Sequence, residues 1–246
     1  MSLFNLVAHR GYTLHYPENT LPAIAAAVTA GAKFVEVDIQ LSADETPFLF
    51  HDRTLERLCG QPGALHDYSA SELAQFRAAD QGRFGDKFKD TPITRLLELL
   101  EFMQAHPELT VFIELKRSSI DKFGIEMMVQ RTLSVLQAVQ AQCVIISYNI
   151  KALAHVQKVY GWLVGAVVDE WQERNQDDIK QLKPEYLFCD LDSLPAEGEI
   201  NYYESRIAVF ECTDAQQALA LAQRGVELIE TFAIGEMLQE TGVLPG

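Results

Sequence analysis

Short runs of apolar and β-branched residues recur along the chain and alternate with longer stretches of helical period. Leu21, Ile24, Ala25 and Val28 recur at the spacing of a buried helix face, and other stretches repeat this pattern. The apolar runs predict strands at residues 6–9, 34–39, 111–115, 144–147, 163–168, 186–189, 207–210 and 227–229. Strands that alternate with helices in this way predict parallel βα units.

Such units either close into a barrel or lie open as a doubly wound sheet, and periodicity alone does not separate the two. The eight runs favour the barrel, and 246 residues are typical of a (β/α)8 TIM barrel that occupies one domain, residues 1–246. Gly31 and Gly161 are expected to end helices, as is Gly225. Thr213 with Gln216 predicts a capping box for the helix before Gly225.

One link between apolar runs is too short for a parallel crossover. Residues 42–46 lead at once into the run that begins at Pro47, so this run must return as an antiparallel hairpin. If Leu41 faces Pro47, His51 lies level with Glu36 and Asp38.

The following segment, about residues 52–95, breaks the alternation. It is polar and rich in Gly, Asp and Phe, and it contains at most one short helix, started by Ser69 and capped back by Glu72. Long inserts near a barrel mouth are lids, substrate-binding loops or plain decoration. We expect this insertion over the C-terminal face of the barrel.

The net charge of the chain limits the kinds of molecule that it is expected to bind. The formal net charge of −15 disfavours binding to nucleic acid or to anionic membrane surfaces, so a small molecule is the expected partner. We find no signal peptide pattern and no apolar run long enough for membrane insertion, which favours a cytoplasmic protein. Cys143, Cys189 and Cys212 lie in or next to short apolar runs without CxxC spacing and are expected to be reduced core residues.

Two acidic residues alternate with β-branched residues in the second predicted strand. Glu36 and Asp38 therefore point to one face, either into water or into the barrel. Two carboxylates inside a barrel need charge compensation, and a divalent cation with oxygen ligands supplies it.

Glu114 and Lys116 repeat this pattern at the end of the next predicted strand. Glu114 thus offers a third carboxylate at the C-terminal ends of the strands, where active sites of these barrels lie.

Two histidines also fall at this edge. His9, followed by Arg10, closes the first strand, and His51 closes the hairpin. Imidazole suits proton transfer near neutral pH, and Arg10 offers a planar fork of donors for phosphate oxygens. The other histidines have no convergent partners and are expected to be structural; they are His15, His66, His106 and His155.

The sequence lacks the motifs of several other enzyme classes. The chain contains no GxSxG elbow, no P-loop, no HExxH and no GxGxxG motif. The three carboxylates and two histidines, together with Arg10 and Lys116, suit metal-assisted cleavage of an anionic ester.

The motifs and their order resemble the glycerophosphodiester phosphodiesterases of the phospholipase-C-like phosphodiesterase superfamily. They are His9-Arg10-Gly11, Pro17-Glu18-Asn19-Thr20, Glu36-Val37-Asp38, His51-Asp52 and Glu114-Leu115-Lys116. The resemblance implies a (β/α)8 barrel that hydrolyses glycerophosphodiesters to glycerol 3-phosphate and an alcohol.

The resemblance also implies roles for individual residues. Glu36, Asp38 and Glu114 would bind one Mg²⁺ or Ca²⁺, and His9 and His51 would form the general acid and base pair. The implied substrate-binding residues are Arg10, Lys116, Asn19 and Phe210.

The second half of the chain departs from the family pattern. Where the family often shows Trp-Thr and Thr-Asp, this chain has Phe210-Glu211-Cys212 and Glu230-Thr231-Phe232. Phe210 still offers an apolar wall for a glycerol moiety, while Glu211 and Glu230 add negative charge. Two alternatives stay open: a related phosphodiesterase acting on lysophospholipids or phosphoinositides, and a barrel that binds glycerophosphodiesters without turning them over.

Overall fold

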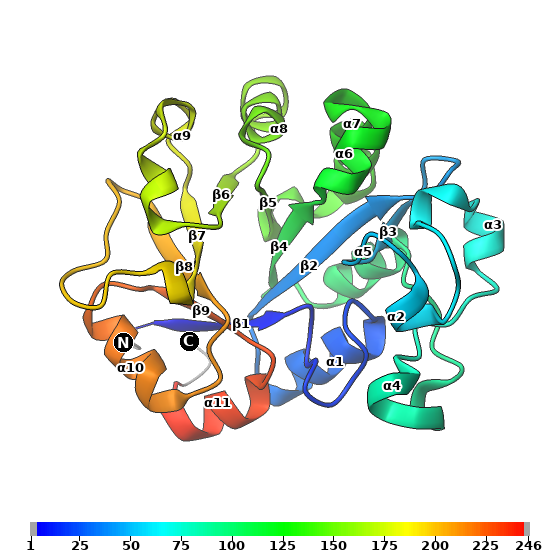
Figure 1. The fold of residues 1–246 in the computed structure, drawn as a ribbon, viewed down its shortest axis with the longest axis horizontal. Helices are drawn as coiled ribbons and strands as arrows, with labels where there is room; N and C mark the ends of the chain where they lie inside the picture. The colour runs from blue at the N-terminus through cyan, green and yellow to red at the C-terminus, as the bar shows by residue number, and fades with distance from the viewer. Residues whose placement is uncertain (1–3, 244–246) are drawn as a thin grey trace.

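Eight parallel strands close into a ring in the computed structural model, which describes residues 4–243 (Figure 1). Ring closure comes from β1, which pairs with both β2 and β9. The strands are β1 (Asn5–His9), β2 (Phe34–Leu41), β4 (Thr110–Leu115), β5 (Cys143–Ser147), β6 (Val164–Val168), β7 (Tyr186–Asp190), β8 (Arg206–Phe210) and β9 (Leu228–Thr231). The predicted TIM barrel and its eight strands are confirmed, and the open doubly wound sheet is excluded.

The predicted hairpin is present as well. Strand β3 (Pro47–Leu49) runs antiparallel to β2, with Leu41 opposite Pro47. The backbone N–H of Phe50 donates to the carbonyl oxygen of Asp38, which continues the pairing by one residue. The hairpin therefore delivers His51 to the C-terminal end of β2.

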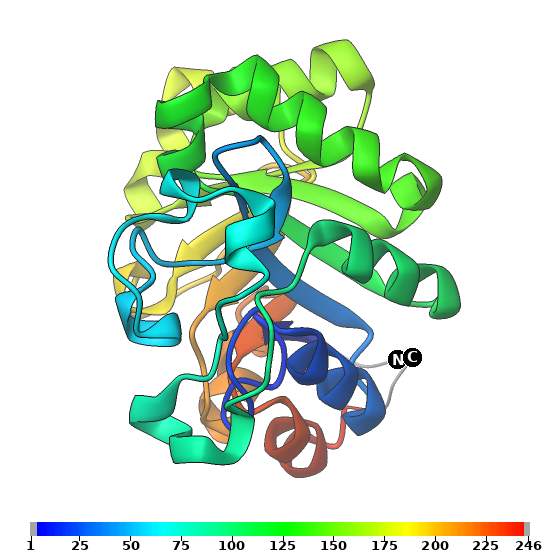
Figure 2. The same ribbon diagram turned by 90° about the vertical axis from the view of Figure 1, so that its right-hand side faces the viewer.

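Helices form an outer layer around the ring in both views (Figures 1 and 2). The helices outside the insertion are α1 (Leu21–Ala30), α5 (Leu96–Ala105), α6 (Arg117–Phe123), α7 (Ile125–Leu136), α8 (Ile150–His155), α9 (Asp177–Leu182), α10 (Ala215–Gln223) and α11 (Ile234–Thr241). Short helical turns join them at η3 (Gln137–Gln142), η4 (Val156–Tyr160), η5 (Trp171–Asn175) and η6 (Leu191–Ser193). Within the described residues, no helix is both long and apolar enough to cross a membrane.

The helix boundaries follow the predicted glycines but not every predicted cap. Gly31 and Gly161 end their helices in the left-handed conformation. Helix α10 is capped by Asp214, whose side chain accepts a hydrogen bond from the Gln217 N–H, so the predicted Thr213 capping box was one residue early. Both residue types cap helices, and the register that buries the apolar face of α10 selects the aspartate.

The insertion after the hairpin holds more local structure than the sequence indicated. At most one short helix was predicted, but there are five helical turns: α2 (Glu56–Cys59), η1 (Leu65–Asp67), α3 (Ala70–Leu73), α4 (Gln81–Phe84) and η2 (Gly85–Phe88). Single turns bury too few residues to leave a periodic pattern. The predicted Ser69 and Glu72 capping box does start α3.

The insertion packs beside the mouth of the barrel, next to α1 and the hairpin (Figures 1 and 2). Leu55, Leu58 and Leu65 contribute to a small hydrophobic core of its own, together with Phe48 and Phe50 of the hairpin. This small core lets the segment hold its shape apart from the main core between strands and helices.

Contacts between the insertion and the loop after β1 fix its position. The Arg83 guanidinium donates to the carbonyl oxygen of Thr13 at 2.6 Å, and the Phe88 ring lies 5.4 Å from that of Tyr16. Because this loop leaves the C-terminal end of β1, the insertion lies at the C-terminal side of the barrel, as expected, although it flanks the mouth.

Alternate strand residues build two separate cores. The inward residues fill the barrel, and they include Val7, Phe112, Val144, Phe188 and Leu228. The outward residues pack against the helices. The last inward residues of this core and the inward positions just beyond it lie at the C-terminal mouth and form the candidate site.

Candidate active site

The mouth of the barrel encloses a cavity of about 200 Å³, to which each strand of the ring contributes one inward residue. These eight residues are His9, Glu36, Glu114, Ile146, Val167, Phe188, Phe210 and Glu230, and Arg10, His51, Lys116, Arg117 and Tyr148 complete the lining. A second, neighbouring cavity of about 410 Å³ shares five of these residues and adds the start of the insertion, residues 52–54. The mouth thus opens toward His51.

Three carboxylates converge at one side of this cavity. Ligand oxygens of Glu36, Asp38 and Glu114 all lie within 4.8 Å of one another. Burial raises the pKa of Glu36 and of Glu114, and the nearby Asp38 charge adds to the rise. The Oε1 atom of Glu36 is buried without a hydrogen-bond partner. The cluster therefore has more negative charge than its surroundings satisfy.

Lys116 and Arg10 compensate part of that charge. The Lys116 ammonium lies 3.0 Å from Asp38 Oδ1 and 3.0 Å from Glu114 Oε1, and Arg10 Nε lies 3.2 Å from Asp38 Oδ2. Burial alone would raise the pKa of Asp38, but Lys116 and Arg10 hold it well below its usual range. Asp38 is therefore the carboxylate that stays ionised most readily.

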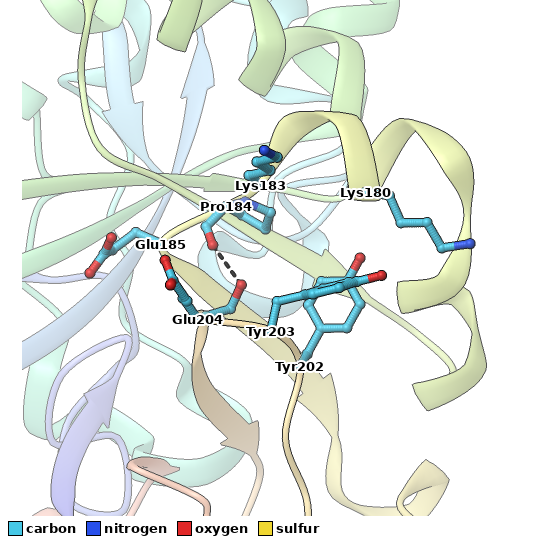
Figure 3. Close-up of a pocket in the computed structure, with 8 residues that line it drawn as sticks. Lys180, Lys183, Pro184, Glu185, Tyr202, Tyr203 and Glu204 are labelled. Carbon is cyan, nitrogen blue, oxygen red and sulfur yellow. Dashed lines mark hydrogen bonds between the residues drawn. The ribbon is translucent and has the colours of Figure 1, made fainter.

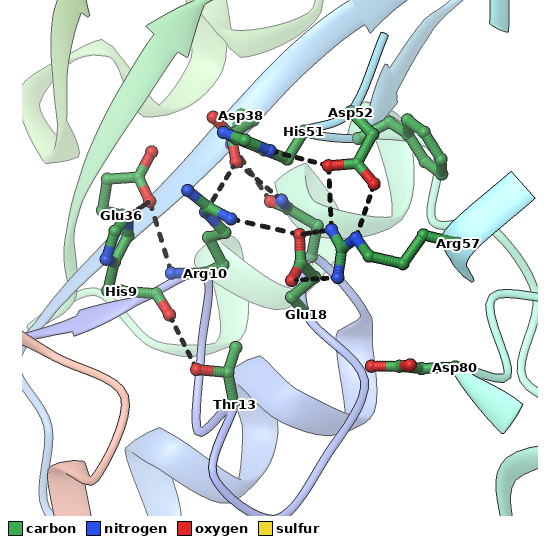
Figure 4. A network of polar contacts seen from close by, with 12 residues as sticks. His9, Arg10, Thr13, Glu18, Glu36, Asp38, His51, Asp52, Arg57 and Asp80 are labelled. Carbon is green, nitrogen blue, oxygen red and sulfur yellow. Dashed lines mark hydrogen bonds and ion pairs between the residues drawn. The ribbon is translucent and has the colours of Figure 1, made fainter. Parts of the chain in front are cut away.

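The loop after β1 fixes Asp38 and Arg10 in place (Figure 4). The Asn19 amide donates to Asp38 Oδ2 at 2.8 Å and accepts from the Asp38 backbone N–H at 3.0 Å. Arg10 and Asn19 have φ angles of 57° and 55°, in the left-handed region. Gly11 has a φ of 92°, and a Cβ there would come within 2.8 Å of Ala23. Only glycine lets this loop pack so closely on α1.

Arg57 forms ion pairs with the carboxylates of a second, neighbouring cluster (Figure 4). Glu18, His51 and Asp52 also have ligand atoms within 4.8 Å of one another. The Arg57 guanidinium already bonds Asp52 Oδ2 at 2.6 Å and Glu18 Oε1 at 2.7 Å, so these charges are paired. A cation fits the Glu36, Asp38 and Glu114 cluster better than this one.

The two histidines lie on different sides of the carboxylates. His51 is one-third exposed, and its Nδ1 lies 2.9 Å from Asp52 Oδ1. His9 is more buried, and its Nδ1 lies 2.6 Å from Glu211 Oε2. Burial lowers the pKa of His9 well below the usual histidine value and raises the pKa of Glu211 to about 8.

Three further residues approach His9. Its ring stacks on Phe232 with centroids 4.9 Å apart, and its Nε2 lies 3.8 Å from oxygens of both Glu36 and Glu230. Burial also raises the pKa of Glu230 well above the usual range, and its Oε1 has no hydrogen-bond partner.

The site residues predicted from the sequence lie close together, and all but two of them line the cavity. Seven line the cavity: His9, Arg10, Glu36, His51, Glu114, Lys116 and Phe210. Asp38 and Asn19 are buried behind them. Tyr148 and Arg117 also line the cavity and were not predicted, although Tyr148 continues the inward face of β5 and Arg117 follows Lys116 directly.

The remaining histidines lie outside the cavity lining, in agreement with their expected structural role. His15, for example, bonds Glu236 at 2.8 Å on the surface.

Among residues 4–243, the side chains that line a hollow at the opposite end of the barrel form no comparable cluster (Figure 3). It lies where the chain enters β7 and β8, between Lys183 and Tyr203. The Ser205 hydroxyl there donates to the carbonyl oxygen of Pro184, which joins the two entering segments.

Comparison with known proteins agrees with this geometry. The family model described as the glycerophosphoryl diester phosphodiesterase family matches residues 9–229. The chain belongs to this family. The predicted enzyme class, a glycerophosphodiester phosphodiesterase, is confirmed at the level of the family.

Two curated relatives in the same class illustrate the extent of the match. A glycerophosphodiester phosphodiesterase of Caldanaerobacter subterraneus is 28% identical over 188 residues, which covers 74% of this chain and 76% of the relative. Human glycerophosphodiester phosphodiesterase 1 is 36% identical over 110 residues, or 45% of this chain and 33% of the human protein. The match to the human enzyme thus spans only a third of its length.

Solved structures share the fold. An Oleispira antarctica phosphodiesterase, solved in complex with its product sn-glycerol-3-phosphate, has a TM-score of 0.83 at 24% identity. The alignment covers 97% of this chain and 96% of the other. At this identity the likeness establishes the TIM-barrel architecture.

Proposed function

We propose that this protein hydrolyses glycerophosphodiesters to glycerol 3-phosphate and an alcohol, with one divalent cation and two histidines. The observation that carries this proposal is the convergence of His9, His51 and three carboxylates in one cavity. Proton donors and acceptors beside a cation site suit cleavage of a phosphodiester.

The donor set fits a hard divalent cation, Mg²⁺ or Ca²⁺. Glu36, Asp38 and Glu114 offer only oxygen atoms, and Glu36 Oε1 is buried with no partner to satisfy it. When bound, such an ion polarises a phosphoryl oxygen and neutralises developing negative charge. Asn19 uses both polar atoms of its amide on Asp38, so we propose that it acts by orienting this carboxylate.

The remaining residues bind and orient the phosphodiester. Arg10 and Lys116 line the cavity and carry cationic donors for the phosphate oxygens. Phe210 supplies an apolar wall for the carbon chain of glycerol. One imidazole takes a proton from the attacking water and the other gives one to the oxygen of the leaving alcohol, because a single ring cannot readily serve both sides of the phosphorus.

The test is release of glycerol 3-phosphate from glycerophosphoethanolamine, glycerophosphocholine and glycerophosphoglycerol. The purified protein is dialysed against EDTA and assayed before and after Mg²⁺ or Ca²⁺ is added. We expect activity only with the metal. Full turnover in excess EDTA would contradict metal dependence.

Two other outcomes would replace the proposed reaction. Release of a cyclic phosphate, or turnover of lysophospholipids or phosphoinositides alone, would indicate the related phosphodiesterases. Binding of glycerophosphodiesters without turnover under any metal condition would indicate a non-catalytic barrel.

A further inference from the structure

We propose that Glu211 is a positioning residue for the reaction: it holds the His9 ring by Nδ1 and thereby directs Nε2 into the cavity. This inference rests on the proposed function, because it assigns His9 a part in catalysis. It concerns the segment after β8, where the sequence departs from the family pattern.

The contact is short, and it joins segments that are far apart in the sequence. Glu211 Oε2 lies 2.6 Å from His9 Nδ1, although 202 residues separate them along the chain. The other oxygen of Glu211, Oε1, accepts a hydrogen bond from the backbone N–H of Phe232. Both carboxyl oxygens are therefore engaged, so the carboxyl group has little freedom to turn away from the ring.

The segment after β9 supports the same arrangement from the other side. Phe232 donates its N–H to Glu211 and stacks its ring on His9 at an interplanar angle of 11°. The His9 ring is thus held along one edge by a hydrogen bond and across one face by an aromatic ring. These two contacts define its position and its rotation.

The other carboxylates near His9 do not compete for this role. Glu36 and Glu230 each approach Nε2 no closer than 3.8 Å, which is too long for a hydrogen bond. They lie on the side of the ring that faces the cavity. With Nδ1 bonded to Glu211, Nε2 is the nitrogen left to exchange a proton with the substrate.

The hydrogen bond fixes the ring wherever the shared proton resides. The proton between Nδ1 and Oε2 belongs either to the imidazole or to the carboxyl group, and the two heavy atoms stay in contact in both cases. Orientation is therefore the property that Glu211 controls.

His51 provides a parallel within the same molecule. Its Nδ1 is held by Asp52 at 2.9 Å, and Asp52 is itself fixed by Arg57. Each histidine of the proposed pair thus has a carboxylate on Nδ1. A carboxylate in this position orients a reacting imidazole in other enzymes, where its loss lowers turnover.

The experiment is a double-mutant cycle on glycerophosphoethanolamine. We expect Glu211→Ala to lower kcat by roughly 10- to 100-fold with KM within about threefold, the scale seen when the hydrogen-bond partner of a metal-ligating side chain is lost. Glu211→Gln keeps the length and a hydrogen-bonding end group, but with its amide oxygen accepting from Phe232 its NH2 group can only donate to Nδ1, so it should recover only part of the loss. In a His9→Ala background, Glu211→Ala should cost less than about twofold, because its effect passes through the ring.

The matched control is Glu236→Gln, which removes the carboxylate from the surface pair with His15 and should leave kcat unchanged. Thermal unfolding of each variant verifies that it is folded; if Glu211→Ala does not fold, the cycle is run with Glu211→Leu and Glu211→Gln. Equal losses in the wild-type and His9→Ala backgrounds would overturn the proposal. So would near-normal kcat in folded Glu211→Ala or Glu211→Leu, which leave Nδ1 of His9 without this hydrogen-bond partner.

A measurement independent of turnover separates this inference from the proposed function. Imidazole ¹H–¹⁵N spectra, with the His9 signals assigned by their loss in His9→Ala, report hydrogen bonding at Nδ1. We expect these signals to change in the Glu211 variants but not in Glu236→Gln. If no diester is hydrolysed by the wild type, the proposed function fails, while unchanged His9 signals in Glu211→Leu would overturn the positioning role itself.

Discussion

The ring of residues at the barrel mouth divides into two halves of opposite character. Strands β9, β1, β2 and β4 are neighbours in the ring and contribute Glu230, His9, Glu36 and Glu114. Strands β5, β6, β7 and β8 form the other half and contribute Ile146, Val167, Phe188 and Phe210. The titratable groups therefore face an apolar wall across a cavity of about 200 Å³.

This difference supports the proposal that the polar half holds a cation. An apolar wall lowers the effective dielectric constant across the cavity, so charges there interact more strongly than in water. Burial raises the pKa of Glu36 and of Glu230, and each keeps one oxygen without a hydrogen-bond partner. In the proposed mechanism the chemistry takes place in the polar half, while the apolar half strengthens its electrostatics and shapes the substrate space.

Loss of either histidine tests the polar half most severely. We expect His9→Ala and His51→Ala each to lower turnover by roughly a hundredfold or more, the usual scale of general acid or base catalysis, with far smaller changes in substrate affinity. The double mutant should lose little beyond the worse single mutant. Steady-state kinetics on glycerophosphoethanolamine and binding calorimetry measure the two quantities. His106→Ala, outside the site, is the control, and near-normal turnover in either site variant would refute the two-histidine mechanism.

The proposed ion site gives the next largest expected effect. Glu114→Gln removes one charged oxygen ligand but keeps the side-chain volume, so the affinity for Mg²⁺ or Ca²⁺ should fall by at least about tenfold. Calorimetric titration of the EDTA-treated protein measures this affinity. Glu227→Gln, on the surface beside Arg206, should bind the ion like the wild type. An unchanged affinity in Glu114→Gln would place the ion elsewhere.

The polar half was largely predictable because its groups lie in contiguous strand-end motifs. Glu36 and Asp38 alternate with apolar residues, so the two-residue period of a strand is enough to place both on one face. The short link after Leu41 likewise predicted the hairpin that carries His51. In each case a local rule decided the position.

Contacts created by ring closure were not predictable in the same way. The bond between Glu211 and His9 depends on the closed order of β8, β9 and β1, which no local pattern encodes. Arg57 reaches Glu18 from an insertion of single helical turns, and such turns leave no periodic signal. The sequence showed that Glu211 and Glu230 depart from the family pattern, but it did not show that both lie near His9.

The pH dependence of the unfolding free energy, measured without metal, should reveal the raised pKa values of the buried glutamates. A carboxyl group whose pKa is raised by folding binds its proton more tightly in the folded state, so the unfolding free energy falls as pH rises through the window between the two pKa values. For Glu211 this window runs from the ordinary glutamate value of about 4.3 to about 8. In EDTA, we expect the Tm to fall between about pH 5 and about pH 8, by roughly 2 to 4 °C for each kcal/mol lost.

Added Mg²⁺ or Ca²⁺ should reduce that fall, because the ion favours the ionised ligands in the folded state. Glu230→Gln should also reduce it by removing one buried acid. Differential scanning calorimetry across this range measures both effects. A Tm that rises with pH in EDTA would show that the groups with lowered pKa values, such as Asp38, dominate instead.

The smallest expected effect belongs to the apolar half. Phe210→Ala removes part of the wall proposed to contact the glycerol carbons, and a lost apolar contact of about 1 kcal/mol corresponds to a roughly fivefold weaker interaction. Because the wall touches no reacting atom, KM should rise by about this factor while kcat changes little, the signature of uniform binding. Phe123→Leu is the control, since this partly buried ring packs against the core away from the cavity. If Phe210→Ala instead lowered kcat as far as a histidine variant does, the apolar half would share in the chemistry, and the division of the mouth into a reacting half and a supporting half would fail.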